Sequence, residues 1–148
     1  MIRVINSIAR ELANIYPTYP IYIQEIPTEF ERPSFFIQFV AGDTEELNKT
    51  KRQDNMTFQV VFFAERDETK FVNVEKQLQE LENIKKPFKK GYLEIEQTDG
   101  RKAKITGLST SYTDKDIYLD IDLYIIDFEP LSEEVKHDYV QDFKFRFK

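Results

Sequence analysis

The sequence predicts an α+β fold in which two helices pack on one face of a single, mostly antiparallel sheet of about six to seven strands. Two stretches show the three- and four-residue apolar spacing of amphipathic helices. Several others alternate between apolar and polar residues, as strands with one buried face do. With 148 residues, 13 Phe, 8 Tyr and no Cys, the chain fits one domain that has an aromatic core and no disulfides.

The first helix is expected at residues 2–15. Its apolar residues follow helical spacing: Ile2, Ile5, Ile8, Ala9, Leu12, Ile15 and Tyr16. Pro17 should end this helix, because the residue before a proline is disfavoured in the helical conformation. A short strand is expected next, at residues 21–26, between two prolines.

Two Phe-rich stretches, residues 34–41 and 56–64, are predicted to pair as a hairpin. The first has apolar residues on both faces and should be central in the sheet. The core residues predicted for the second are Phe58, Val60 and Phe62. The polar residues 42–55 between them are predicted to form a long loop at the hairpin tip, and such loops are usually functional or disordered.

A second helix is expected at residues 68–83, with Asp67 as its N-cap. Its predicted core face consists of Phe71, Val74, Leu78 and Leu81. A basic connector follows, made of Lys85, Lys86, Lys89 and Lys90 around Pro87-Phe88. Residues 92–98 and 101–112 should form a second hairpin, because Asp99-Gly100 suits a type I′ turn.

Residues 116–128 carry the longest alternation and predict a long strand with one dry face and one wet, acidic face. The dry face is Ile117, Leu119, Ile121, Leu123 and Ile125. The wet face is Asp116, Tyr118, Asp120, Asp122 and Tyr124. At Ile125-Ile126-Asp127 the alternation slips by one residue, which indicates either a bulge or the end of the strand.

The last residues, 131–148, are predicted to be a C-terminal extension or an extra edge strand of the same single domain, 1–148. Phe143, Phe145 and Phe147 alternate there with Lys144, Arg146 and Lys148. The favoured interpretation is a seventh strand that completes its own sheet. The alternative is a strand added to the sheet edge of a neighbouring subunit.

Little in the sequence supports catalysis. The lone histidine, His137, lies in a charged segment and is expected to be a solvated surface residue. An all-carboxylate Mg²⁺ site remains an alternative, if two acidic strands are adjacent. Its residues would be Glu94, Glu96, Asp120 and Asp122, with Lys102 and Lys104 completing a nuclease-like cluster. We expect no enzyme activity, cofactor or metal.

The formal charge of −6 argues against non-specific nucleic-acid binding by the chain as a whole. The basic run Lys49, Lys51 and Arg52 is expected to be a solvated loop tip, with a nucleic-acid contact as the alternative. No apolar run approaches the roughly 20 residues that span a bilayer, so no membrane contact is expected. Charged residues interrupt the N-terminal apolar stretch, which predicts a cytoplasmic protein.

The order of these segments resembles the tail terminator, or tail completion, proteins of long-tailed bacteriophages and of prophage elements in Gram-positive bacteria. The residues that carry the resemblance are the helix that ends at Tyr16-Pro17, the stretch Arg32-Pro33-Ser34-Phe35-Phe36-Ile37-Gln38, the strand Phe58-Gln59-Val60-Val61-Phe62-Phe63, and the closing Leu119-Asp120-Ile121-Asp122-Leu123-Tyr124. The resemblance covers about residues 1–128.

The resemblance implies a structural subunit of a ring, typically a hexamer, that caps the head-proximal end of the tail tube and stops its polymerisation. Its partners would be itself, the tail tube protein and the head-tail connector, with DNA only as passing cargo. It would act in the host bacterial cytoplasm during assembly and then in the virion tail or neck. The alternative is another neck component, such as a head-completion or connector protein. Candidate partner or ring contacts are Lys49, Lys51, Arg52, Phe143, Phe145 and Phe147.

Overall fold

The computed structural model of the chain describes residues 2–66, 73–95 and 101–128. The elements are, in order, α1 (Ile2–Ile15), β1 (Ile21–Ile23), β2 (Ser34–Glu46), β3 (Lys51–Phe63), α2 (Val74–Lys85), the 3-10 helix η1 (Lys86–Phe88), β4 (Tyr92–Glu94), β5 (Lys102–Thr113) and β6 (Asp116–Phe128). They form a 6-stranded sheet in the spatial order β1-β2-β3-β6-β5-β4. Only the β1–β2 pair is parallel. The predicted α+β fold is confirmed.

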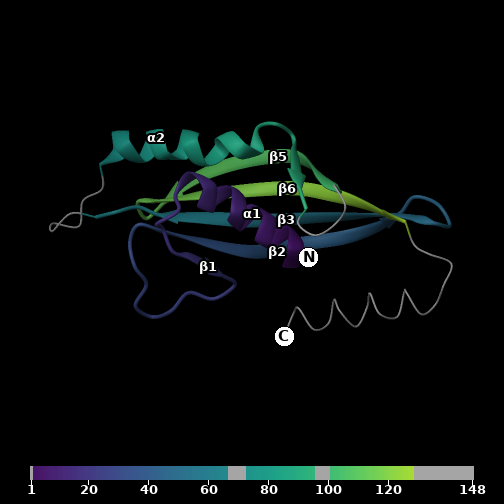
Figure 1. The fold of residues 1–148 in the computed structure, drawn as a ribbon, viewed down its shortest axis with the longest axis horizontal. Coiled ribbons are helices and arrows are strands. Elements are labelled where there is room, and N and C mark those ends of the chain that lie inside the picture. Colours follow the sequence, from purple (N-terminus) through teal and green to yellow (C-terminus); the bar gives the residue numbers. More distant parts are fainter. Residues whose placement is uncertain (1, 67–72, 96–100, 129–148) are drawn as a thin grey trace.

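The main core lies between one face of the sheet and the two helices, which share that face (Figure 1). The sheet supplies the aromatic residues Phe35, Phe58 and Phe62, all at most 1% exposed. The helical layer covers them with Ile8, Leu12, Ile84 and Phe88. The predicted core residues of the second Phe-rich strand are therefore confirmed.

Strand β6 has the predicted dry face, since Ile117, Leu119, Ile121 and Leu123 are at most 3% exposed. The slip at residues 125–127 is not a bulge, and the described strand ends directly after it, at Phe128. β6 stays in register with β3 up to the pair Lys51–Phe128. The register shifts lie instead in the flanking strands, between Phe39 and Ala41 in β2 and between Ile105 and Gly107 in β5.

The predicted loop at residues 42–55 is wrong, because most of it is strand. β2 continues to Glu46 and β3 begins at Lys51, so only residues 47–50 connect them. Cross-strand side chains hold this polar pairing: Thr44 donates to Asp54 at 2.7 Å and Asn55 donates to Asp43 at 2.7 Å. We call residues 43–46, 51–55 and 124–128 the arm, three paired strand ends in which β3 is flanked by β2 and β6.

Helix α2 begins at Val74, with Asn73 as its N-cap, and not at residue 68. Asp67 and Phe71 lie outside the described residues. The predicted core face of this helix is only partly correct: Leu81 packs against the core, but Val74 and Leu78 are 53% and 54% exposed. Gln77 is turned inward instead, and its side-chain amide donates to the Lys115 carbonyl at 2.6 Å.

Strand β1 is shorter than predicted. It ends at Ile23 because Gln24 adopts a positive φ of 65° and turns the chain away from β2. β4 and β5 pair as the second hairpin, while Asp99-Gly100 and the predicted seventh strand lie outside the described residues.

Replacing Phe58 with Ala should lower the free energy of unfolding by about 3–5 kcal/mol, because the ring is fully buried and its loss leaves a cavity. Leu78→Ala is the matched control and should change it by less than about 0.5 kcal/mol, since this side chain is mostly exposed. Urea unfolding followed by circular dichroism measures both. A large effect at Leu78 would contradict the orientation of α2.

Candidate functional site

The sheet face opposite the helices carries a ladder of polar side chains across its three central strands. The Gln38 amide donates to Gln59 at 2.8 Å, and the Gln59 amide donates to Asp120 at 3.0 Å. In the neighbouring row the Thr57 hydroxyl donates to Asp122 at 2.6 Å. The wet carboxylates of β6 are thus bonded within the sheet, and the ladder leaves a polar surface on this face.

At one end of the sheet, Phe30 and Arg32 from the segment before β2 cover part of this second face. Phe36, Val61 and Phe63 form a small apolar cluster there, with Tyr22, Phe30 and Tyr118 packed against it. Phe30 contacts Phe63 with ring centroids 4.5 Å apart, and the Arg32 guanidinium lies 5.2 Å from each ring. The second face is therefore divided into a covered apolar end and an open polar remainder.

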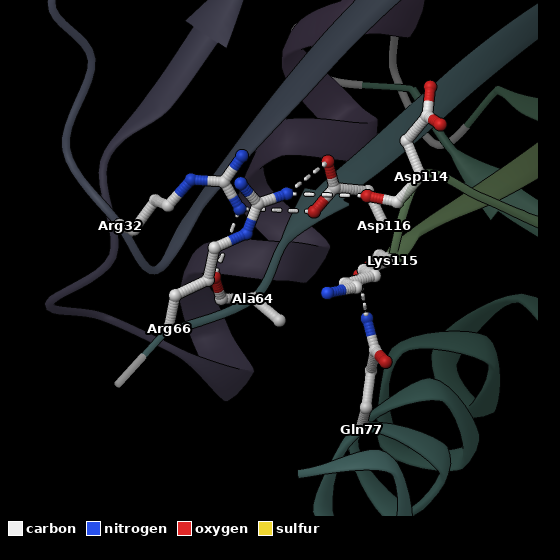
Figure 2. Close-up of polar contacts among 7 residues, drawn as sticks. All are labelled: Arg32, Ala64, Arg66, Gln77, Asp114, Lys115 and Asp116. Atoms are coloured by element: carbon white, nitrogen blue, oxygen red, sulfur yellow. Dashed lines mark hydrogen bonds and ion pairs between the residues drawn. The ribbon is translucent and has the colours of Figure 1, made fainter. Parts of the chain in front are cut away.

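Asp116 lies beside this cluster and is 5% exposed (Figure 2). Its carboxylate pairs with Arg32 at 3.1 Å and with Arg66 at 3.6 Å. The same guanidinium groups donate to backbone carbonyls, Arg32 to Ala64 at 3.1 Å and Arg66 to Asp114 at 3.3 Å. The prediction of a wet Asp116 is wrong, because Arg32 and Arg66 close over it.

The ion pairs tie together the end of β3, the segment before β2 and the turn from β5 to β6. In that turn Asp114 and Lys115 both have positive φ, 52° and 68°, as a two-residue type I′ hairpin requires. Gln77 of α2 bonds the same turn from the helical layer (Figure 2). Polar contacts from both layers therefore hold this end of the sheet in place.

The arm begins where two bulges flank one row of the sheet. Ala41 pairs with Thr57, Thr57 with Asp122, and Asp122 with Gly107. The register shifts of β2 and β5 occur immediately beside this row. Bulges bend and twist a strand, so this row marks the change from body to arm. An open cavity of about 360 Å³ lies here, lined by residues of all four strands.

Gly107 has a packing role in this row. A Cβ atom at this position would lie 3.1 Å from Oδ2 of Asp122, which is closer than a side chain ordinarily tolerates. Because glycine has no Cβ, it lets the carboxylate lie over β5.

The predicted basic loop tip is only partly correct. Lys49 lies in the connection between β2 and β3, but Lys51 and Arg52 belong to β3 and are half-buried. Phe143, Phe145 and Phe147 lie outside the described residues, as do Glu96 and His137.

The proposed Mg²⁺ cluster is not brought together by the fold. β5 separates β4 from β6, and Glu94 pairs with Lys102 whereas Asp120 pairs with Ser109. Those β5 positions are about 23 Å apart along the strand at the usual rise per residue. In residues 2–66, 73–95 and 101–128 no group of three His, Cys, Asp or Glu is arranged to hold a metal ion.

The two lateral sides of the sheet are the most distinctive surfaces. β1 pairs only with Phe35–Ile37 of β2, and β4 only with Lys102–Lys104 of β5. Within the described chain, long parts of β2 and β5 are thus left as sheet edges. Among the described residues, six of the seven exposed large apolar residues lie near these sides: Ile26, Val40 and Leu47 near β1 and β2, and Val74, Leu78 and Tyr112 near α2 and β5. The seventh, Ile126, lies on the inner strand β6.

Sequence reasoning found the apolar spacing of Val74 and Leu78 but assigned it to the core. Leu47 and Tyr112 gave no periodic signal, because each is a single apolar residue between polar neighbours, whereas Val40 lies in an apolar stretch that was assigned to a central strand. No helix among the described residues is long and apolar enough to cross a membrane.

Three groups have raised pKa values where the segment after α1 lies near α2. Burial raises the pKa of Glu80, with Lys76 opposing the shift and Glu65 adding to it. Burial also raises the pKa values of Tyr16 and Tyr19, whose rings stack 4.6 Å apart, and the charge of Glu80 adds to both shifts. On the exposed side of α2, the hydrogen bond from Lys89 lowers the pKa of Glu82.

Asp116→Ala should lower the free energy of unfolding by about 2–3 kcal/mol, because it leaves two guanidinium groups beside each other without their carboxylate. Glu94→Ala, at an exposed position, is the control and should have little effect. Urea unfolding decides this, and equal stabilities of the two variants would contradict the role of the ion pairs.

Glu80→Gln should raise the melting temperature at pH 7 but not at pH 4. Because the pKa of Glu80 is raised by folding, its ionisation disfavours the folded state, and this loss appears as the pH rises above the ordinary carboxyl range. Thermal unfolding at both pH values measures the difference, with Glu25→Gln, at an exposed position after β1, as control. A stabilisation that is the same at both pH values would refute it.

A comparison with protein families matches most of the chain. Residues 3–135 match the family model described as phage tail terminator protein. The matched region includes every described strand, all of α2 and all of α1 except Ile2. No curated protein matches the sequence. The chain belongs to the phage tail terminator family.

Proposed function

We propose that this structural protein of the phage tail assembles as a ring, a hexamer, that caps the head-proximal end of the tail tube, stops its polymerisation and provides the surface that joins the head. Membership of the tail terminator family supports a structural role in the phage tail. The observation that supports the ring is that the two lateral sides of the sheet are different surfaces. Each of them has an open strand edge and exposed apolar residues.

A closed ring is built from head-to-tail contacts, in which one side of a subunit meets a different side of the next. The β2 side and the β5 side meet this requirement, since they lie at opposite ends of the strand order. Exposed apolar residues on both sides would be buried when copies associate, which favours association. Unpaired strand edges add hydrogen-bonding groups to the same surfaces.

The arm suits the contact with the tube. β3 is paired on both sides along the arm, so the arm projects as a three-stranded ribbon from the helix-covered body (Figure 1). Backbone hydrogen bonds stiffen such a ribbon and keep its tip in a defined position. Lys49, Lys51 and Arg52 lie at or near this tip and remain our candidate contacts, together with Phe143, Phe145 and Phe147.

The charge of the chain suits a channel for DNA. Each copy carries a formal charge of −6, and phosphate groups would be repelled rather than retained. In this role the protein is made in the host bacterial cytoplasm, becomes part of the tail or neck of the virion, contacts the tube protein and the head-tail connector, and performs no catalysis.

Tail tubes polymerised with the tube protein of the same phage should lengthen without limit in the absence of this protein and stop at its addition. Electron microscopy of negatively stained tubes gives the length distribution and any extra density at one end. Unchanged lengths at saturating protein would refute the capping role. Binding to portal-side proteins alone would point to another neck component.

The same assay includes a test of the tip. Lys49→Ala/Lys51→Ala should require more protein to stop growth, because it removes two cations at the end of the arm. Lys85→Ala/Lys86→Ala removes the same charge at the end of α2 and should behave as the wild type.

A further inference from the structure

One row of the sheet connects the two lateral sides at the level where the arm begins. Asp43 of β2 pairs with Asn55, Asn55 with Tyr124, Tyr124 with Lys104, and Lys104 with Tyr92 of β4. Residues paired in this way project on the same face of a sheet. An acidic residue therefore begins this row on one side, and a basic residue lies next to its end on the other.

The β2 end of the row is acidic. Asp43 and Glu45 are exposed, alternate onto the same face and lie beyond the part of β2 that β1 covers. We call these two residues the acidic edge. Asp43 also accepts a hydrogen bond from Asn55. Glu46 is left out, because Arg52 lies directly opposite it on β3. The exposed Val40 lies beside this edge.

The β4–β5 end is basic. Lys102 and Lys104 are exposed, and Lys90 lies near them. The ammonium groups of Lys90 and Lys102 lie 4.9 and 4.5 Å from the centre of the Tyr92 ring. Both cations are attracted to this ring and therefore lie close to each other on the surface. We call Lys90, Lys102 and Lys104 the basic edge.

The acidic groups near the basic edge reduce its charge but do not cancel it. Glu94 pairs with Lys102 across the two strands, and Glu11 lies 3.8 Å from Lys90.

We infer that the acidic edge of one copy docks on the basic edge of the next copy around the ring, an inference that rests on the proposed ring. The two edges are complementary in charge, and they lie on the same and neighbouring rows. Docking them therefore joins copies with little displacement along the strands. Head-to-tail contacts close into a ring when the rotation between copies closes without a shift along the ring axis, and otherwise they build a helical filament.

Charge reversal tests this contact, because two variants with opposite reversals should restore association when they are mixed. Asp43→Lys/Glu45→Lys makes both sides of a copy basic, and Lys102→Glu/Lys104→Glu makes both sides acidic. Either variant alone should associate at least about tenfold more weakly than wild type, since like charges then meet at every contact. An equimolar mixture should recover association, because alternating copies restore opposite charges at every contact.

The measurements are sedimentation velocity of the free protein and the number of copies bound per tail-tube end. The control Glu29→Lys/Glu31→Lys makes the same change in charge at exposed positions of the segment between β1 and β2, and it should associate as wild type. Melting temperatures confirm that each variant is folded. Association of the wild type should also weaken as salt rises from about 0.05 to 0.5 M, because exposed charges are screened.

The outcomes separate this inference from the proposed function. Wild-type protein that caps tubes, together with reversal variants that cap equally well or folded variants that do not recover on mixing, overturns the docking of these edges but leaves the ring. Wild-type protein that neither associates on tubes nor caps them overturns both.

Discussion

The antiparallel pairing of β3 with β6 is the constraint on which the rest of this structure depends. The ladder runs from Phe62–Ile117 to Lys51–Phe128 without a register shift. On one face it sets Phe58 against Ile121 in the core, and on the other it sets Gln59 against Asp120 in the polar ladder. Because side chains alternate with period two, a slip of one residue would turn the carboxylates of β6 into the core. Burial of apolar side chains on one face of the sheet thus determines which polar side chains lie next to each other on the opposite face.

The same ladder explains why the arm exists. Residues 43–46 and 51–55 have too few apolar side chains to be held by burial, and a two-stranded polar hairpin is marginal in water. β6 adds a third strand along this segment, so the backbone groups of β3 are paired on both sides. The bulges that bend the sheet fall in β2 and β5, the strands outside this pair. The central pair remains regular while its neighbours adapt to the change from body to arm.

Sequence patterns predicted the features that depend on burial of apolar side chains. They missed the features that depend on strand pairing or on the order of strands in the sheet. The order of the elements, the dry face of β6 and the core residues Phe58, Val60 and Phe62 followed from period-two alternation. The β2 and β3 parts of the arm were missed because these stretches have no apolar face to alternate. Of the candidate site, acidic β6 was identified, but the separation of Glu94 from Asp120 depends on β5 lying between them, which no local pattern encodes. In α2 the apolar spacing at Val74 and Leu78 is real, yet the monomer buries Gln77 instead, because its amide satisfies the carbonyl of a tight turn.

A slip of two residues between β3 and β6 would keep every side chain on its own face, although it would change which core residues are neighbours. It would nevertheless move Asp43 relative to Lys104 by about 7 Å along the strands, because the row that links them crosses this pair. Ion pairs form only within about 4 Å, so a subunit in the slipped register could not make the inferred contact with its neighbour at the same level. Assembly would therefore require one register of β3 against β6, and the side-chain hydrogen bonds that cross these two strands, Gln59–Asp120 and Thr57–Asp122, favour that register.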